Sequence, residues 1–221
     1  ELKPGDQIPT EKELCEIYDA SRMTVNKAIM MLCEKHLIER IAGKGSFVRD
    51  FRTIKNLQLG STGSFTEDMI STGKNPGAKL IEYKLVKGEE VPQVRDALKL
   101  TDDDFIHYFI RLRTGDDLPI AISYTYLSTK VIPSLDINVL KGSLYKYIKK
   151  LGYQIKGIDA QYSAVMPTEK QKKLLEIENI ALFKSQHITF LSDGTPFEYI
   201  STYYRGDQYT YSLKTFFKDE K

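Results

Sequence analysis

Apolar residues near the start of the chain recur with the spacing of a helix. Leu14, Ile17 and Tyr18 share one face of a helix expected over about 11–18. Thr10 precedes it and Glu13 follows three residues later, which is the pattern of a capping box. Residues 19–21 then interrupt the periodicity, so the first element is a short helix followed by a turn.

A second helix and a hairpin follow this turn. Ser21 is placed to cap a helix running to about Lys35, and Val25, Ile29 and Leu32 share its apolar face. Two strand-like runs, "LIERI" (37–41) and "SFVRD" (46–50), then flank "AGKG", whose glycines permit positive φ. The pattern predicts helix, turn, helix and hairpin within 50 residues.

Beyond residue 63 the pattern alternates long strands with short helices. Strands are expected near 78–87, 105–114, 118–127, 153–165, 181–191 and 196–205, and helices near 65–72, 91–98, 142–151 and 168–176. The turns "TGDD" and "LSDGT" join neighbouring strands as hairpins, which indicates a mostly antiparallel sheet. We therefore predict two domains, at 1–50 and 64–221, the larger of class α+β, with "LGSTGS" in a linker over 51–63.

Composition excludes several classes of protein. The chain is 41% hydrophobic and 28% charged, with no apolar run of membrane-spanning length and no charged-then-apolar leader. We therefore expect a cytoplasmic protein without a membrane partner. Cys15 and Cys33 lack CxxC spacing and are interpreted as reduced packing thiols. The net charge of +2 hides an asymmetry, because residues 1–20 hold six acidic and two basic residues whereas residues 21–49 hold six basic and two acidic ones.

The outward face of the second predicted helix carries donors for nucleic acid. Arg22 and Asn26 lie one turn apart beside Met23, Lys27 and Met30, a face that suits a major groove or a merely solvated helix surface. The hairpin favours the first interpretation, because Lys44 at its tip can reach phosphate or a minor groove. Helix-turn-helix plus hairpin is the pattern of a winged helix.

The stretch from "LKPGDQIPT" to "AGKGSFV" resembles the winged-helix domain of GntR-type bacterial transcription regulators. The resemblance implies that the Ser-Arg-x-Thr motif and the Gly-Lys-Gly wing contact operator DNA. It places Asn26 where the family usually has arginine, so a contact that commonly favours guanine is expected to favour adenine or to be absent. The family also places a helix before this stretch, so we expect a truncated N-terminus. The DNA-contact candidates are Thr10, Ser21, Arg22, Met23, Thr24, Asn26, Lys27, Gly43, Lys44 and Gly45.

The larger predicted domain carries binding chemistry. In "FIHYFIRLR" the alternation of a strand places Arg111 and Arg113 on the face of His107 and Phe109. Two guanidinium groups aimed the same way suit a phosphate or carboxylate, and ion pairs with residues 102–104 would suit them equally well. Ser64 or Thr66 can begin a helix whose free N–H groups favour an anion.

The same region resembles the UTRA effector-binding domain of the HutC subfamily, through "SFTEDM", "RLRTGDDLPIAISYTYL", "GSLYKYI" and "PFEYISTYYRGD". The resemblance implies a chorismate lyase-like fold acting as a ligand sensor, often for phosphorylated sugars. It implies an anion-binding set of Arg111, Arg113 and Ser143 with the backbone at Phe65 and Thr66. Further ligand contacts are implied at Tyr145, Glu198 and Tyr204, residues whose pattern alone would also fit sheet-surface packing. Position 123 is a serine in this chain, whereas many relatives have a glutamate at the matching position of this strand.

These patterns predict a DNA-binding regulator, a repressor of a sugar-uptake or catabolic operon. It would bind palindromic double-stranded operator DNA as a homodimer and respond to a small anionic effector, a sugar phosphate or a non-phosphorylated carboxylate. An enzyme is not favoured, because His36, His107 and His187 are scattered and no nucleophile motif, metal spacing or cofactor motif is present. A third possibility is a DNA-binding protein that binds no ligand. In such a protein Arg111 and Arg113 would form salt bridges, whereas in a ligand sensor they would line a cavity.

Overall fold

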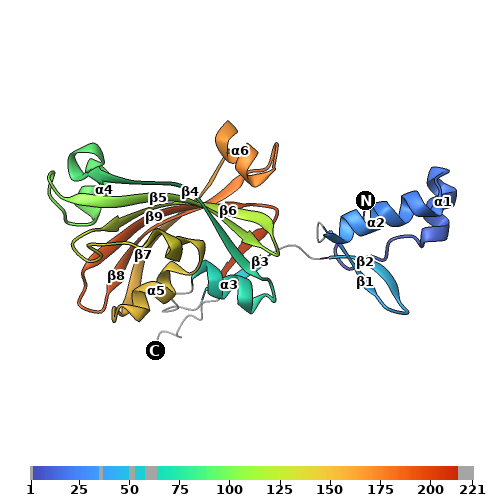
Figure 1. Cartoon of the computed structure of the whole chain (residues 1–221), viewed down its shortest axis with the longest axis horizontal. Helices are drawn as coiled ribbons and strands as arrows, with labels where there is room; N and C mark the ends of the chain where they lie inside the picture. The colour runs from blue at the N-terminus through green and yellow to red at the C-terminus, as the bar shows by residue number, and fades with distance from the viewer. Residues whose placement is uncertain (1, 35–36, 50–52, 58–63, 214–221) are drawn as a thin grey trace, which may run out of the picture. The chain divides into compact units, whose positions relative to one another are not determined.

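The computed structural model describes residues 2–34, 37–49, 53–57 and 64–213, and the chain divides into two compact units, Glu1–Arg52 and Thr53–Lys221 (Figure 1). Each unit has its own buried core. In the described part of the chain, none of the helices is long and apolar enough to cross a bilayer. The two-domain α+β class predicted from the sequence is confirmed.

The first unit is a helix-turn-helix followed by a hairpin. It consists of α1 (Glu11–Tyr18), α2 (Arg22–Glu34), β1 (Ile38–Ile41) and β2 (Gly45–Val48), with β1 and β2 antiparallel. The capping box predicted at the start of α1 is present, since Thr10 and Glu13 each accept the other's backbone N–H. The position predicted for the end of α2, Lys35, lies outside the described residues.

A small core holds this unit together. Ile8, Val25, Ile29 and Ile38 are buried, and the half-buried thiols of Cys15 and Cys33 pack against them without pairing. The backbone before α1 also lies along β2, because Ile8 donates to the Ser46 carbonyl at 2.9 Å. The hairpin is therefore fixed to the helices on one side and to the entering chain on the other.

The second unit is built on a six-stranded antiparallel sheet with the order β4-β5-β6-β9-β8-β7. Its strands are β4 (Pro76–Lys87), β5 (Phe105–Gly115), β6 (Leu118–Ser128), β7 (Ile155–Val165), β8 (Leu182–Leu191) and β9 (Pro196–Arg205). The hairpin between β5 and β6 turns through Asp116 and Asp117, which both have positive φ as a two-residue turn of this kind requires. The mostly antiparallel arrangement predicted from the turns is confirmed.

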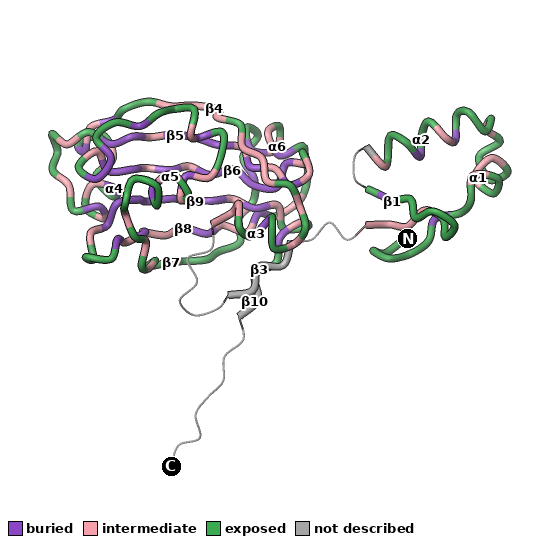
Figure 2. Tube along the Cα trace, turned by 60° about the horizontal axis from the view of Figure 1, so that its bottom comes forward, coloured by how far each residue is buried: buried purple, intermediate pink, exposed green. Residues whose placement is uncertain are grey.

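Helices cover both faces of this sheet, and the purple segments of Figure 2 mark its buried strands. One face packs against α3 (Phe65–Ser71), the 3-10 helix η2 (Ile137–Lys141) and α5 (Leu144–Lys150), through cores that contain Phe109, Leu140 and Met69. The other face packs against α4 (Pro92–Ala97), which follows the 3-10 helix η1 (Gly88–Glu90), and against α6 (Glu169–Leu175). The alternation predicted along β5 holds, since Ile106 and Ile110 face α4 and α6.

The linker predicted over 51–63 needs a correction. Residues 53–57 form strand β3 (Thr53–Leu57), which pairs in parallel with β10 (Tyr209–Leu213) near the end of the chain. Sequence reasoning missed both strands, because each is only five residues long and a parallel partner more than 150 residues away leaves no turn signal between them. The rest of the predicted linker lies outside the described residues.

Candidate functional site

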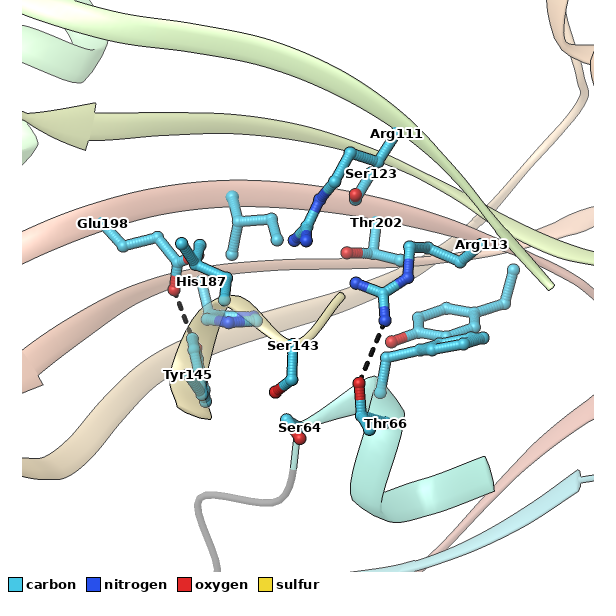
Figure 3. Close-up of a pocket in the computed structure, with 14 residues that line it drawn as sticks. Ser64, Thr66, Arg111, Arg113, Ser123, Ser143, Tyr145, His187, Glu198 and Thr202 are labelled. Carbon is cyan, nitrogen blue, oxygen red and sulfur yellow. Dashed lines mark hydrogen bonds between the residues drawn. The ribbon is translucent and has the colours of Figure 1, made fainter. Parts of the chain in front are cut away.

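A cavity of about 70 Å³ opens between the sheet of the second unit and the first turns of α3 and α5. By the measure in which one water needs about 10–15 Å³, this is room for several waters or a compact polar group. All eight predicted effector residues line it: Phe65, Thr66, Arg111, Arg113, Ser143, Tyr145, Glu198 and Tyr204. Figure 3 shows the labelled side chains converging from strands β5 and β9 and from the starts of α3 and α5, among them those of Arg111, Arg113, Thr66 and Glu198.

The two arginines are buried in this cavity without an acidic partner. Arg111 is 3% and Arg113 5% exposed, and among the described residues neither forms an ion pair with a carboxylate. Two of the acidic residues that could have paired with these arginines form ion pairs with other cations: Asp102 pairs with Arg95 and Asp104 with Lys130. The interpretation of Arg111 and Arg113 as surface salt-bridge residues is therefore wrong.

The contacts that these guanidinium groups do make are few and weak. Arg111 donates from Nη1 to the Gly142 carbonyl at 3.4 Å, and Arg113 donates from Nη2 to the Thr66 hydroxyl at 3.2 Å (Figure 3). Arg113 also lies 4.5 Å above the Phe65 ring. Within the described part of the chain, the Nε atoms of both arginines have no hydrogen-bond partner. Both forks thus keep donors available for an anion.

Burial makes the charged form of both side chains unfavourable. It lowers the pKa of Arg111 to about 10, against the opposing effect of Glu198, and the pKa of Arg113 to about 9, where the neighbouring Arg111 adds repulsion. Both remain cationic near neutral pH. An anion placed between them would offset a desolvation penalty that reaches several kcal/mol for a buried ion.

A carboxylate network closes the other end of the cavity. Glu198 is fully buried, and its Oε2 accepts from the Tyr145 hydroxyl at 2.7 Å (Figure 3) and from the Thr189 hydroxyl at 2.7 Å. Burial raises the pKa of Glu198, while these two hydroxyls and Arg111 oppose the shift. Its Oε1 has no partner. The cavity therefore offers donors at one end and an acceptor at the other.

Cross-strand register brings these residues together. Arg111 lies opposite Ser123, which lies opposite Thr202, and Arg113 belongs to the next row with Tyr204. The Oγ of Ser123 is buried beside Arg111 without a partner. Sequence reasoning did not assign several lining residues to the site: Ser64, Ser123, Leu144, His187, Ile200 and Thr202. Period-2 spacing from Glu198 would have found Ile200 and Thr202, whereas His187 requires the register of β8.

The predicted DNA-contact residues lie on the surface of the first unit. All are exposed except Asn26, which is half-buried, and Arg22 has 86% of its side chain exposed. Ser21 caps α2, accepting from the Thr24 N–H at 3.2 Å and contacting its hydroxyl at 2.9 Å. The structure therefore places Arg22 and Thr24 in the first turn of α2, the position from which a recognition helix reaches base edges.

The wing is a tight turn held by a side chain from outside it. Lys44 donates its N–H to the Ile41 carbonyl at 2.9 Å, and the Gln7 amide donates to the Lys44 carbonyl at 3.0 Å. Gly43 and Gly45 have φ of +74° and +116°, which side-chain-bearing residues rarely adopt. The turn thus presents the exposed Lys44 side chain at its tip.

Comparison with known families matches both units. The model of the gntR family of bacterial regulatory proteins matches residues 1–48, and the UTRA domain model matches residues 71–210. The chain belongs to the GntR family. It is a GntR-type regulator with a UTRA domain, the architecture expected from its resemblance to the HutC subfamily, and it is not an enzyme.

Individual GntR-family relatives cover nearly the whole chain. The transcriptional repressor NagR of Bacillus subtilis is 32% identical over 213 residues, which are 96% of this chain and 86% of NagR. MngR of Escherichia coli, a repressor of a mannosyl-D-glycerate transport and metabolism system, is 27% identical over 96% of this chain and 88% of its own length. The crystal structure of PhnF from Mycobacterium smegmatis shares the fold, with a TM-score of 0.69, 22% identity and coverage of 98% of this chain and 95% of PhnF.

Proposed function

We propose that this GntR-family protein is a repressor of a sugar-uptake or catabolic operon whose operator affinity is changed by a small anionic effector, best a sugar phosphate. The effector would occupy the cavity between Arg111 and Arg113, and the protein would bind palindromic double-stranded DNA as a homodimer through Arg22, Thr24 and Lys44. The single observation that carries the proposal is the pair of buried guanidinium groups without carboxylate partners.

The polar groups around the two arginines support a phosphate. The hydroxyl of Thr66 lies beside the Arg113 fork, and Ser64 and Ser143 line the cavity between Thr66 and Tyr145 (Figure 3). A phosphate monoester offers three acceptor oxygens, and arginine forks and hydroxyl donors both recognise them. At the other end of the cavity, Glu198 would accept hydrogen bonds from sugar hydroxyls and Tyr145 would donate to them.

A second effector class, the non-phosphorylated carboxylates, is supported by the net charge of the groups that line the cavity. The formally charged groups that line the cavity are two cations and one carboxylate, so a carboxylate monoanion would bring the sum to zero. The name of one relative favours a sugar-related ligand, because MngR is a repressor of a mannosyl-D-glycerate transport and metabolism system. The proposed homodimer matches the proposed palindromic operator, since two half-sites require two reading heads.

The test is a thermal-shift titration of the purified chain. The panel contains hexose phosphates, the matching unphosphorylated hexoses, inorganic phosphate and small sugar acids, each at several concentrations. At 100 times its dissociation constant a ligand stabilises the folded protein by about 2.7 kcal/mol, which corresponds to roughly 5 °C or more in a domain of this size. Arg111→Lys and the matched exchange Arg95→Lys, in an exposed ion pair of the same unit, are run in parallel.

pH separates phosphate from carboxylate. The second ionisation of a phosphate monoester has a pKa of about 6, so its shift should grow between pH 5.5 and 7.5, whereas that of a sugar acid should stay constant. His187 lines the same cavity, so the titration is repeated with His187→Gln to remove any imidazole contribution. A phosphate-specific shift that Arg111→Lys abolishes and Arg95→Lys keeps is the expected result. Equal shifts in all three proteins, or no shift with any anion, would contradict the proposal.

A further inference from the structure

We infer that Arg40, on the first strand of the wing, orients the Asn26 amide so that α2 reads guanine rather than adenine. Arg40 is not among the residues predicted to contact DNA. Its Nη2 pairs with the Glu11 carboxylate at the start of α1 and also donates to Oδ1 of Asn26 at 3.4 Å. One guanidinium group thus connects α1, α2 and β1 beside the base-reading face.

The chemistry of the guanidinium group fixes which way the amide faces. Arginine only donates hydrogen bonds, so the atom of Asn26 that faces Arg40 must be the oxygen. The amide nitrogen Nδ2 then lies on the other branch of the side chain, and no described residue accepts a hydrogen bond from it. Asn26 is half-buried while its neighbours Arg22 and Lys27 are exposed, which is consistent with a side chain held by such a contact.

The orientation of this amide decides which base edge it suits. Asparagine reads adenine with both of its atoms, because Oδ1 accepts from the N6 amino group while Nδ2 donates to N7. At Asn26 the oxygen already accepts from Arg40, whose positive charge also repels an amino group. Guanine presents two acceptors, O6 and N7, to Nδ2. The pair therefore favours guanine, in contrast to the adenine preference or missing contact expected from the sequence alone.

The Glu11 carboxylate is the anchor of this arrangement. It contacts Nε of Arg22 at 3.7 Å as well as Arg40, so it holds two arginines on the same side of the unit. A surface ion pair by itself adds little to stability. The two N–H groups of Arg40 Nη2, held in the guanidinium plane, nevertheless reach a carboxylate and an amide at once, whereas the donors of a lysine ammonium rotate freely and have no fixed plane. The conservative exchange Arg40→Lys therefore keeps the charge and removes the orientation.

The experiment selects binding sites for the full chain, without effector, from a duplex library with a fully randomised segment, and sequences the bound DNA. Wild type, Arg40→Lys, Asn26→Ala and the double variant are compared. Arg95→Lys in the second unit serves as a matched control, because it makes the same exchange in an arginine that pairs with Asp96 and Asp102. Glu11→Gln is included as a second way to release Arg40, should Arg40→Lys fail to fold.

We expect wild type to enrich guanine at one position of each half-site, and Asn26→Ala to lose that preference. Arg40→Lys and Glu11→Gln should lower the guanine-to-adenine ratio at the same position by roughly fivefold, the lower end of one base contact. In the double variant Arg40→Lys should not change the guanine-to-adenine ratio further, because the Asn26 amide that Arg40 orients is absent. Any of four results would overturn the inference. The guanine-to-adenine ratio could stay unchanged in both Arg40→Lys and Glu11→Gln, or the effect could fall at a different position. Wild type could also enrich adenine, or enrich no sequence. The ligand titration depends on neither residue, so failure of one does not imply failure of the other.

Discussion

Replacing Arg113 with methionine is expected to stabilise the effector-free protein slightly while abolishing its response to anions. Exchanging buried ionic groups for apolar ones of similar volume is often neutral or stabilising by about 1–4 kcal/mol. Against this gain stand the hydrogen bond to Thr66, about 1 kcal/mol, and the contact with the Phe65 ring, about 1 kcal/mol. The expected change in unfolding free energy therefore lies between a fall of about 1 kcal/mol and a rise of about 2 kcal/mol, centred on a slight increase.

The neighbouring arginine should behave differently. The charge of Arg111 opposes the rise in the pKa of the buried Glu198, so Arg111→Met leaves that carboxylate with less compensation and is expected to destabilise by about 3 kcal/mol. Arg95→Met removes a half-buried arginine whose partners Asp96 and Asp102 are themselves exposed, and should stay near wild type. A clear difference between Arg111 and Arg113, which lie two residues apart on the same face of β5, would reflect the charge balance of the cavity rather than its packing.

Urea titration followed by near-UV circular dichroism measures these changes. The chain has no tryptophan, and 13 of its 14 tyrosines lie in residues 53–221, so the signal reports the second unit. The midpoint should shift without a change in slope if the unit unfolds in one step. A fall of 2 kcal/mol or more for Arg113→Met, together with a retained phosphate response, would show that Arg113 is a structural residue and refute the reasoning.

Three further predictions concern other parts of the chain. Lys130 and the Thr101 N–H lower the pKa of Asp104 to about 2. The ionised Asp104 therefore contributes fully to stability above the unfolded pKa of 3.8, and this contribution is lost as the pH falls towards 2. Urea midpoints measured between pH 5 and 2 should fall less in Asp104→Asn than in wild type. Tyr145→Phe removes a donor to the buried Glu198 and should lower the unfolding free energy by about 1.5–3 kcal/mol in the same titration, and no loss would argue against the network. Gly45→Ala places a Cβ 2.5 Å from the Gln7 amide at a φ of +116°, whereas Gly43→Ala meets open space at +74°; amide hydrogen exchange of β1 and β2 should be accelerated more by the first, and equal rates would refute the clash.

Much of the fold could be predicted because local signals agreed with the final structure. Thr10, Ser64 and Thr168 each cap a helix at a boundary visible in the sequence, and the alternation along β5 separated Arg111 and Arg113 from their apolar neighbours. The effector residues came from resemblance combined with this alternation. Local pattern could not show that the arginines lack acidic partners, because the alternative partners at 102–104 are close in sequence and only packing directs them elsewhere.

Register explains why the rest of the site could not be predicted. Counting back from the turn at Asp116 and Asp117 would pair Arg111 with Ile122, but an irregularity between Arg113 and Thr114, beside Pro119, shifts the pairing by one residue and brings Ser123 opposite Arg111. Proline has no N–H for the ladder and occurs at such positions. A second irregularity, between Thr189 and Phe190, brings His187 into the row of Ile200. A one-residue shift changes which strand residues meet on a face, and neither shift has a sequence signal strong enough to predict it.

The position of α3 links the cavity chemistry to the remainder of the unit. Thr66 contacts Arg113 in the first turn of α3, and Asp68 in the same helix accepts a hydrogen bond from the Tyr209 hydroxyl of β10 at 3.3 Å. Tyr209 stacks on Tyr204, another lining residue of the cavity, with ring centroids 3.9 Å apart. A ligand shifts an equilibrium only by the difference in its contacts with the two states. An anion that replaces Thr66 as the partner of Arg113 would change contacts at α3, and through Asp68 those of the strand that pairs with β3, the first strand of the unit after the winged helix.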